Sequence, residues 1–267
     1  MTSAQVCCRL AFLLAISASL VPALANEIPT VSGSLALELN HKTTDRKSTG
    51  TSRNDLYGFA EADVSFRLND YVSTRAVATF EPLTDPHPLA DRVFQNEDVR
   101  WKDVYVQYDD GVMGFRGGRI TANFGRAWYA APGLDATTLA EDYAIWDRMG
   151  ISTWYRLKTA SFGTTTLGAM LFSMDTSPLS ESWRNTRKRR TPEQGGPSNT
   201  DSPTSIALSL DGGDIARLPG FSWQLAVLQQ KVDFRMDSAG QRNDHVADEK
   251  GATAGIQQVL RITHRVE

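Results

Sequence analysis

The chain has 267 residues, and its 28 Lys and Arg residues stand against 31 Asp and Glu residues, a formal net charge of −3. This mildly acidic balance argues against nucleic acid as the main partner, because binding to a phosphate backbone needs clustered positive charge. Beyond the N-terminal segment no apolar run approaches the roughly 18 residues of a transmembrane helix, so we expect no helical membrane span.

Residues 1–25 differ in composition from the rest of the chain. One basic residue, Arg9, precedes an apolar run over residues 10–16, and the segment ends in Ala23-Leu24-Ala25. A basic start, a short apolar centre and small residues at the end are typical of a cleaved secretory signal peptide. We therefore expect export, with Asn26 as the first residue of the mature chain.

Both cysteines, Cys7 and Cys8, lie within this segment, so the mature chain has none and cannot be a disulfide-stapled secreted scaffold. Cleavage also removes Arg9 and no acidic residue. The mature chain then carries 27 basic and 31 acidic residues, a formal charge of −4.

From about residue 30 onward, apolar and polar residues alternate in segments of about ten residues, the length with which a tilted strand crosses a bilayer. In the first segment Val31, Leu35, Leu37 and Leu39 share one face. We expect about ten strands, over residues 31–40, 56–68, 71–81, 103–108, 112–121, 150–161, 163–174, 205–210, 221–234 and 251–263. Short turns alternate with longer polar loops, which predicts an all-β, antiparallel, up-and-down transmembrane β-barrel.

The connection over residues 122–149 is long and rich in aromatic residues. It holds Asn123-Phe124-Gly125, the pair Trp128-Tyr129 and several acids. A connection longer than about 12 to 15 residues is usually functional or disordered, and this aromatic content argues against disorder. We interpret it as a loop folded into a pore; the alternative is an ordinary surface loop on a soluble β-domain.

The hairpin before this loop carries a recognisable pattern. Asp103-Val-Tyr-Val-Gln-Tyr108 leads through the turn Asp109-Asp-Gly111 to Gly117-Gly-Arg-Ile-Thr-Ala-Asn-Phe-Gly125 and then to the aromatic, acid-containing loop. This unit resembles the Gram-negative outer-membrane porins. The resemblance implies that the loop folds inward and narrows a channel, that the protein lies in the outer membrane in contact with its lipid and lipopolysaccharide, and that it is a homotrimer.

Two features depart from the porin pattern. Members of that family end on an aromatic residue, whereas this chain ends in Arg265-Val-Glu267. An aqueous channel also needs roughly 16 strands. Either the barrel closes with few strands and an atypical terminus, or the sequence is a C-terminally truncated member of the family, which is the interpretation we favour.

A constriction of this kind needs acids on the loop and bases on the wall, so that a transverse field orders water and selects small hydrophilic solutes. The candidate constriction residues are Asp135, Glu141, Asp142 and Asp147 on the loop, and Arg67, Arg75, Arg119 and Arg156 on the wall. The alternative is that these charges belong to solvated faces of a soluble sheet, where ion pairs contribute little. The basic run over residues 184–190 is either a site for lipopolysaccharide phosphates or anionic solutes, or a solvated loop.

The sequence disfavours an enzyme. The four histidines, His41, His87, His245 and His264, are scattered singly, which disfavours both a Ser–His nucleophile and a metal site. No Gly-rich phosphate loop follows a strand and opens a helix. We therefore expect no catalytic residues, metal or cofactor.

Taken together, these features predict an outer-membrane porin for passive diffusion of small hydrophilic solutes or ions. The first alternative is a secreted or periplasmic β-sandwich that binds a ligand or glycan. A third possibility is a barrel that serves adhesion or envelope structure without conductance.

Overall fold

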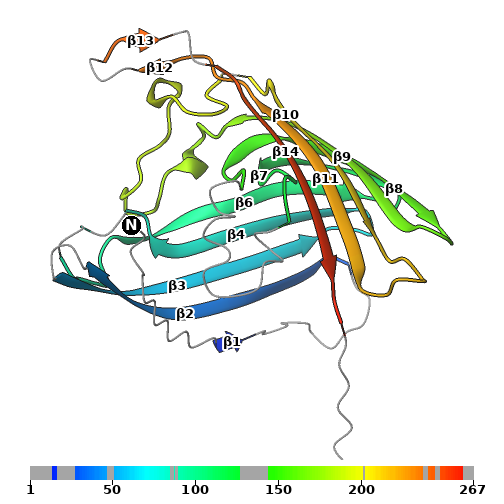
Figure 1. Ribbon diagram of the computed structural model, residues 1–267, viewed down its shortest axis with the longest axis horizontal. Coiled ribbons are helices and arrows are strands. Elements are labelled where there is room, and N and C mark those ends of the chain that lie inside the picture. Colours follow the sequence, from blue (N-terminus) through cyan, green and yellow to red (C-terminus); the bar gives the residue numbers. More distant parts are fainter. Residues whose placement is uncertain are drawn as a thin grey trace, which may run out of the picture. The chain divides into compact units, whose positions relative to one another are not determined.

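The computed structural model describes residues 14–16, 28–46, 51–84, 87, 90–126, 144–200, 202–236, 240–243 and 247–260. This part of the chain is all-β, and its main feature is an antiparallel, up-and-down, open sheet (Figure 1). The strands are β1 (Leu14–Ile16), β2 (Thr30–Arg46), β3 (Thr51–Arg67), β4 (Val72–Pro82), β5 (Arg92–Val93), β6 (Glu97–Asp109), β7 (Met113–Ile120), β8 (Arg148–Thr159), β9 (Gly163–Met174), β10 (Ser205–Gly213), β11 (Phe221–Gln230), β12 (Arg235–Met236), β13 (Arg242–Asn243) and β14 (Glu249–Gln258). Two short 3-10 helices, η1 (Pro178–Ser180) and η2 (Pro192–Gln194), lie between β9 and β10.

The strands pair in the order β1-β2-β3-β4-β6-β7-β8-β9-β10-β11-β14, so that the main strands follow one another almost as they do in the sequence. The short β5 pairs with β3 in parallel, and β12 and β13 form a separate hairpin. The predicted all-β, antiparallel, up-and-down class is confirmed. Closure into a transmembrane barrel stays a prediction. In the described part of the chain, no helix is long and apolar enough to cross a membrane.

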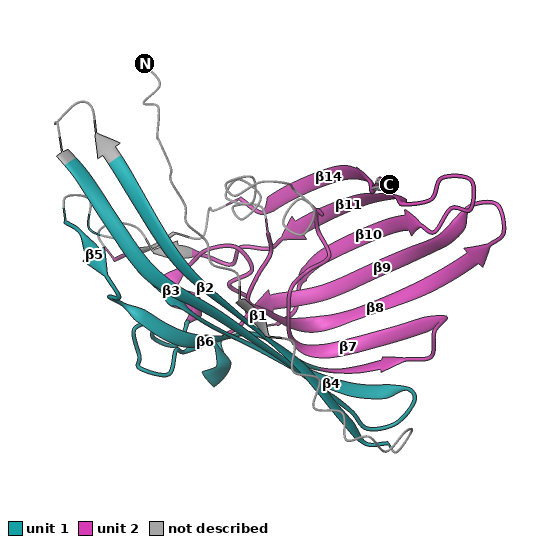
Figure 2. Ribbon diagram, turned by 90° about the horizontal axis from the view of Figure 1, so that it is seen from below, with its two compact units in different colours: residues 1–105, 176–190 teal, residues 106–175, 191–267 magenta. Residues whose placement is uncertain are grey.

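The chain divides into two compact units (Figure 2). Unit 1 contains residues 1–105 and 176–190, and unit 2 contains residues 106–175 and 191–267. Unit 1 therefore includes β1 to β5, the larger part of β6 and the first part of the polar segment after β9, with η1. Unit 2 includes the remaining strands and the beginning and end of the predicted inward loop.

Several strand boundaries differ from the prediction. Residues 41–54 were predicted to be a polar loop, but β2 continues to Arg46 and β3 begins at Thr51. Within this extension the Thr43 hydroxyl donates a hydrogen bond of 3.0 Å to the Asn54 side-chain oxygen. Strands that are polar on both faces show no apolar alternation, so the periodicity missed them. For the same reason β6 begins at Glu97 rather than at residue 103.

Other strands have the predicted bounds or are shorter than predicted. The strand predicted over residues 163–174 is β9, with the same bounds. The strand β11 ends at Gln230 rather than at residue 234, and β14 runs from Glu249 to Gln258 rather than over residues 251–263. Of the predicted end of that last strand, residues 261–263 lie outside the described residues.

The predicted tight turn between β6 and β7 is confirmed. The Asp110 carboxylate accepts hydrogen bonds from the backbone N–H groups of Met113 and Val112, at 2.8 and 2.9 Å. These bonds favour the charged carboxylate and lower the pKa of Asp110. Gly111 has a φ of 87°, a conformation that a residue without Cβ adopts at little cost.

In unit 2 the two faces of the sheet differ in polarity, and the apolar face is the exposed one. Along β11, Leu225 and Val227 are each 51% exposed, whereas the alternating side chains, two of them polar and two apolar, are buried: Gln224, Ala226, Leu228 and Gln230. The exposed large apolar side chains on these strands are Val106, Met113, Phe115, Ile151, Tyr155, Leu157, Leu167, Leu171, Leu208, Leu225, Val227 and Ile256. In a soluble domain this face would normally be covered.

The register aligns these apolar side chains from strand to strand. Leu167 of β9 pairs with Tyr155 of β8 and with Leu210 of β10, and Leu210 pairs in turn with Leu225 of β11. Because side chains opposite each other lie on the same face of a sheet, the row is continuous across four strands. Unit 1 has the same feature at its first strands, where Val31, Leu35, Leu37, Leu39 and Val64 are exposed.

Candidate functional site

The first residues of the predicted inward loop lie on the polar face of unit 2. Asn123 donates hydrogen bonds of 2.9 Å to the Ser209 hydroxyl and to the Asp211 carboxylate, both on β10. Gln224 of β11 donates to the Asn123 side-chain oxygen at 2.8 Å and to Asp211 at 2.7 Å. Asn123 is thus bound to side chains that alternate with the exposed apolar residues of these strands.

The residues after Asn123 continue across this face to β14. A Cβ atom placed on Gly251 would lie 2.9 Å from the Phe124 ring, and one placed on Gly255 would lie 4.0 Å from the Cβ of Arg126. Gly125 is likewise close to Thr253 of the same strand. The glycines of β14 therefore leave the space in which the loop begins its course over the polar face.

Replacing Asn123 by alanine is expected to lower the free energy of unfolding by about 1 to 2 kcal/mol, because buried Gln224 loses an acceptor and Asp211 a donor. Urea unfolding followed by tryptophan fluorescence measures this. Asn123→Asp keeps the acceptor for Gln224 but places a second carboxylate beside Asp211. It should therefore lower the free energy of unfolding at least as much as Asn123→Ala does. Unchanged stability in both variants would show that these bonds do not hold the loop.

Two polar cavities lie on this face, both within unit 2. The first has a volume of about 290 Å³ and is lined in part by Asp109, Arg116, Trp154 and Arg156. The second has a volume of about 580 Å³ and is lined in part by Arg126, Asp214, Gln224 and Gln257. Asn123, Thr166 and Asp211 line both cavities, so the two adjoin at the start of the loop.

Arg156, a predicted wall base, lies at the first cavity. Its guanidinium donates two hydrogen bonds, of 2.7 and 2.8 Å, to the Asp109 carboxylate. The guanidinium carbons of Arg156 and Arg116 lie 5.6 and 5.4 Å from the centre of the Trp154 ring. Arg156, on β8, is therefore paired with an acid at the end of β6, on the far side of β7.

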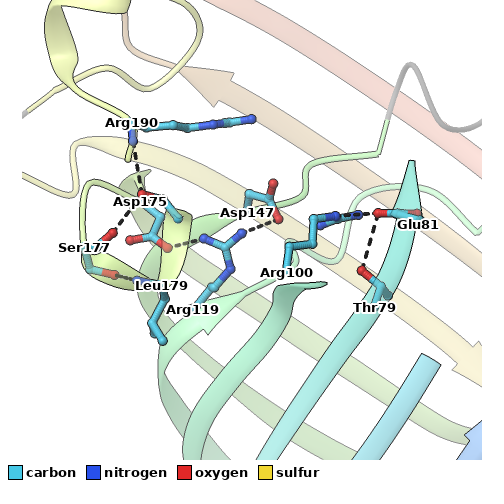
Figure 3. A network of polar contacts seen from close by, with 10 residues as sticks. Thr79, Glu81, Arg100, Arg119, Asp147, Asp175, Ser177, Leu179 and Arg190 are labelled. Atoms are coloured by element: carbon cyan, nitrogen blue, oxygen red, sulfur yellow. Dashed lines mark hydrogen bonds and ion pairs between the residues drawn. The ribbon is translucent and has the colours of Figure 1, made fainter. Parts of the chain in front are cut away.

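Arg119 and Asp147 are the one predicted wall and loop pair that the described residues bring together. They form an ion pair of 2.6 Å, and Arg119 also pairs with Asp175 at the end of β9 (Figure 3). Arg119 is only 1% exposed, and both acids are buried. This burial favours a role in fixing the end of the loop, where Asp147 has a φ of 59°, to β7 and β9.

In unit 1 a series of ion pairs follows the polar sides of β3, β4 and β6. Arg75 donates two hydrogen bonds, of 2.8 and 2.6 Å, to the Asp63 carboxylate, and it contacts the Tyr105 hydroxyl at 3.5 Å. Two further pairs join Lys102 to Glu61, at 2.8 Å, and Arg100 to Glu81, at 2.5 Å. Figure 3 shows Glu81 also accepting a bond from Thr79. Arg75 keeps part of its surface exposed beside Asp63.

The basic run over residues 184–190 is anchored in unit 1 by a buried acid. The Asp98 carboxylate accepts hydrogen bonds from the Ser182 hydroxyl at 2.6 Å, from the backbone N–H of Arg184 at 3.0 Å and from that of Thr186 at 3.2 Å. The backbone of Trp183 is bonded to β6 at Val99. The exposed Arg184 and its neighbours are thus presented on a loop that is tied to β6.

The remaining candidates are placed as follows. Arg67, at the end of β3, is exposed and bonded to Asp70 of the adjoining turn at 3.4 Å. Asp135, Glu141 and Asp142 lie outside the described residues. In the described part of the chain, no cluster of three or more His, Cys, Asp or Glu residues could hold a metal ion.

Sequence reasoning did not select the acids that pair with the predicted wall arginines, Asp63, Asp109 and Asp175, as constriction residues. It also missed Asn123 and Gln224 as contact residues of the loop. The position of Gln224 in the alternation of its strand places it on the polar face. That pattern could have marked it as a candidate contact residue. The pairing itself depends on the register between strands and could not be read from the sequence.

Comparisons of the chain with protein-family models, with curated proteins and with solved structures found no match.

Proposed function

We propose that this chain is an outer-membrane β-barrel porin, a water-filled channel for passive diffusion of small hydrophilic solutes or ions. The observation that carries the proposal is the exposed apolar face of the sheet, on which Leu225 and its apolar neighbours lie, while the opposite face buries polar side chains such as Gln224 and Ser209 among apolar ones. In lipid an outward apolar face is favourable, and a polar inner face surrounds water. In water the same arrangement would expose a large apolar surface.

The strand lengths support this proposal. Crossing a bilayer takes about 9 to 11 residues of tilted strand. β4, β6, β8, β9, β11 and β14 have 11, 13, 12, 12, 10 and 10 residues. Each of them can therefore span the apolar layer of a membrane.

The contacts of Asn123 support the constriction that we propose for residues 122–149. A loop that begins by bonding to the polar face of β10 and β11 is directed toward the side that would enclose water. The ion pairs of Arg75 and Arg156 then contribute fixed charges of both signs to the wall. Export through a cleaved signal peptide, the outer-membrane location, contact with lipopolysaccharide and a homotrimeric state form part of the same proposal.

The alternative of a secreted or periplasmic β-sandwich is less well supported. A sandwich buries the apolar faces of two sheets against each other. The exposed apolar rows of unit 2 have no such cover among the described residues.

Single-channel recording tests the proposed function. The full sequence, expressed in a Gram-negative host and purified in detergent from the outer membrane, is expected to give stepwise, salt-dependent currents in planar bilayers. A chain that stays in solution without detergent and gives no current would refute the membrane proposal. A detergent-dependent chain without current would support a barrel that serves adhesion or envelope structure.

Neutralising Arg75 is expected to shift the ion selectivity of the channel. In Arg75→Gln the Asp63 carboxylate loses its partner, so the preference for potassium over chloride should rise by up to about fivefold, as for an interaction of about 1 kcal/mol in water. The reversal potential in a salt gradient measures this change. Arg217→Gln, an exposed charge in the turn between β10 and β11, should leave it unchanged. Equal effects of the two variants would contradict a lining role for Arg75.

A further inference from the structure

We propose that the polar face of unit 2 binds a neutral, hydroxyl-rich solute, a saccharide, in the two cavities that adjoin at Asn123. This inference rests on the proposed channel function and names its substrate class. The cavity volumes of about 290 and 580 Å³ match or approach the range of roughly 300 to 1,000 Å³ in which proteins hold small ligands. The segment that separates the cavities is the start of the proposed constriction, where a passing solute would be slowed.

The charges around the cavities argue against an anionic ligand. Arg116 and Arg156 of the first cavity are balanced by Asp109 and Asp211, and Arg156 is bonded to Asp109 through both of its terminal nitrogens. In the second cavity the acids outnumber the bases, because Arg126 stands with Asp211 and Asp214. Neither cavity therefore offers the excess of positive charge that recognition of an anion requires.

Two buried polar atoms favour a ligand with hydroxyl groups. The indole Nε1 of Trp154 and the side-chain oxygen Oε1 of Gln224 have no hydrogen-bond partner within the part of the chain that the structure describes. Their residues are only 9% and 2% exposed, and they line the first and the second cavity, respectively. A buried polar group without a partner costs about 1 to 3 kcal/mol, so it is usually satisfied by water or a ligand.

The two atoms have opposite hydrogen-bonding roles. The Trp154 nitrogen can only donate, whereas the Gln224 oxygen can only accept. A hydroxyl group can do both, and a saccharide presents several of them at close spacing. Thr166, which lines both cavities, adds a hydroxyl between them.

The test uses three probes with the same pyranose ring and different charge: glucose, glucuronate and glucosamine. Glucose added to the channel in planar bilayers is expected to reduce the ion current in a saturable manner, more strongly than glucuronate or glucosamine at equal concentration. Calorimetric titration of the detergent-purified chain with glucose provides a second measure of binding, and it does not depend on conduction.

Trp154→Phe removes the indole N–H and keeps an aromatic ring, so the half-blocking concentration of glucose should rise about fivefold, as for the loss of one neutral hydrogen bond. Trp223→Phe is the matched control, because Trp223 neighbours Gln224 along β11 and its side chain alternates to the opposite face. Thr166→Val should weaken glucose binding without loss of aromatic packing. Salt conductance at the wild-type level establishes that each variant is folded.

The outcomes separate this inference from the proposed function. Stronger binding of glucuronate or glucosamine would overturn the neutral ligand, and equal effects of the two tryptophan variants would overturn the site. Salt currents without glucose binding in either measurement would refute the saccharide site but leave the channel. Glucose binding that depends on Trp154 in a chain without currents would keep the site and refute the channel.

Discussion

Replacing Leu225 by arginine is expected to destabilise the protein by about 2 to 4 kcal/mol in lipid vesicles and to reduce its recovery from the outer membrane. Leu225 lies in the middle of β11, is 51% exposed and pairs with Leu210 and Ala254. If this face meets lipid, the guanidinium enters the apolar layer, where an arginine near the midplane carries that cost. Urea unfolding of the vesicle-bound protein, followed by tryptophan fluorescence, measures the difference.

Leu218 provides a matched control for this substitution. It is also 51% exposed, but it lies in the turn between β10 and β11. Leu218→Arg should cost about 0 to 1 kcal/mol, because charges near the membrane surface remain hydrated. On a soluble β-sandwich the two positions are equivalent surface sites, and both substitutions should stay within about 0.5 kcal/mol of the wild type. That result would refute the membrane proposal.

Replacing Arg119 by methionine is expected to lower the free energy of unfolding by about 3 to 5 kcal/mol. Methionine fills a similar volume but removes the cation that contacts Asp147 and Asp175, and all three residues are buried. Removing one partner from a buried ion pair costs this much because charge stays in the interior without its counterion. The same urea titration measures the effect.

Two further variants test the cause of this loss. Arg119→Met combined with Asp147→Asn and Asp175→Asn should recover a large part of the stability, because the acids no longer carry charge. Arg67→Met removes an exposed pair with Asp70 and should cost no more than about 1 kcal/mol. An Arg119→Met protein as stable as the Arg67→Met protein would show that the buried cluster does not hold β7, β9 and the end of the loop together.

Alternation alone was enough to predict the fold class and most strands. The bounds of β9 and the turn at Asp109-Asp110-Gly111 agree with the prediction, because successive side chains point to opposite faces whatever the strand pairs with. The prediction failed at residues 41–54, where Thr43 and Asn54 form a polar ladder pair. Such strands are stabilised by pairing with a neighbouring strand, and the local sequence pattern does not predict this pairing.

The candidate site was predicted in part. The alternation of apolar and polar residues predicted that Arg75, Arg119 and Arg156 lie on the polar face. In the structure each of the three forms an ion pair. The partners expected for them were loop acids, but Arg75 and Arg156 bind Asp63 and Asp109, which lie on other strands of the sheet. Only Arg119 contacts a predicted loop acid, Asp147, in a buried position. Burial depends on the packing of several segments, so the sequence could not distinguish a buried charge from an exposed one.

The sequence by itself therefore determined most of the strands, the turn between β6 and β7 and the residues of each face, because these follow from local geometry and from a period of two residues. Only the tertiary structure decided which charges are paired and where the loop begins to cross the sheet. Asn123 and Asp211 lie 88 residues apart, and Arg119 and Asp175 lie 56 apart. Contacts over such separations are set by the register of the intervening strands, in which a shift of one residue would turn each side chain to the other face.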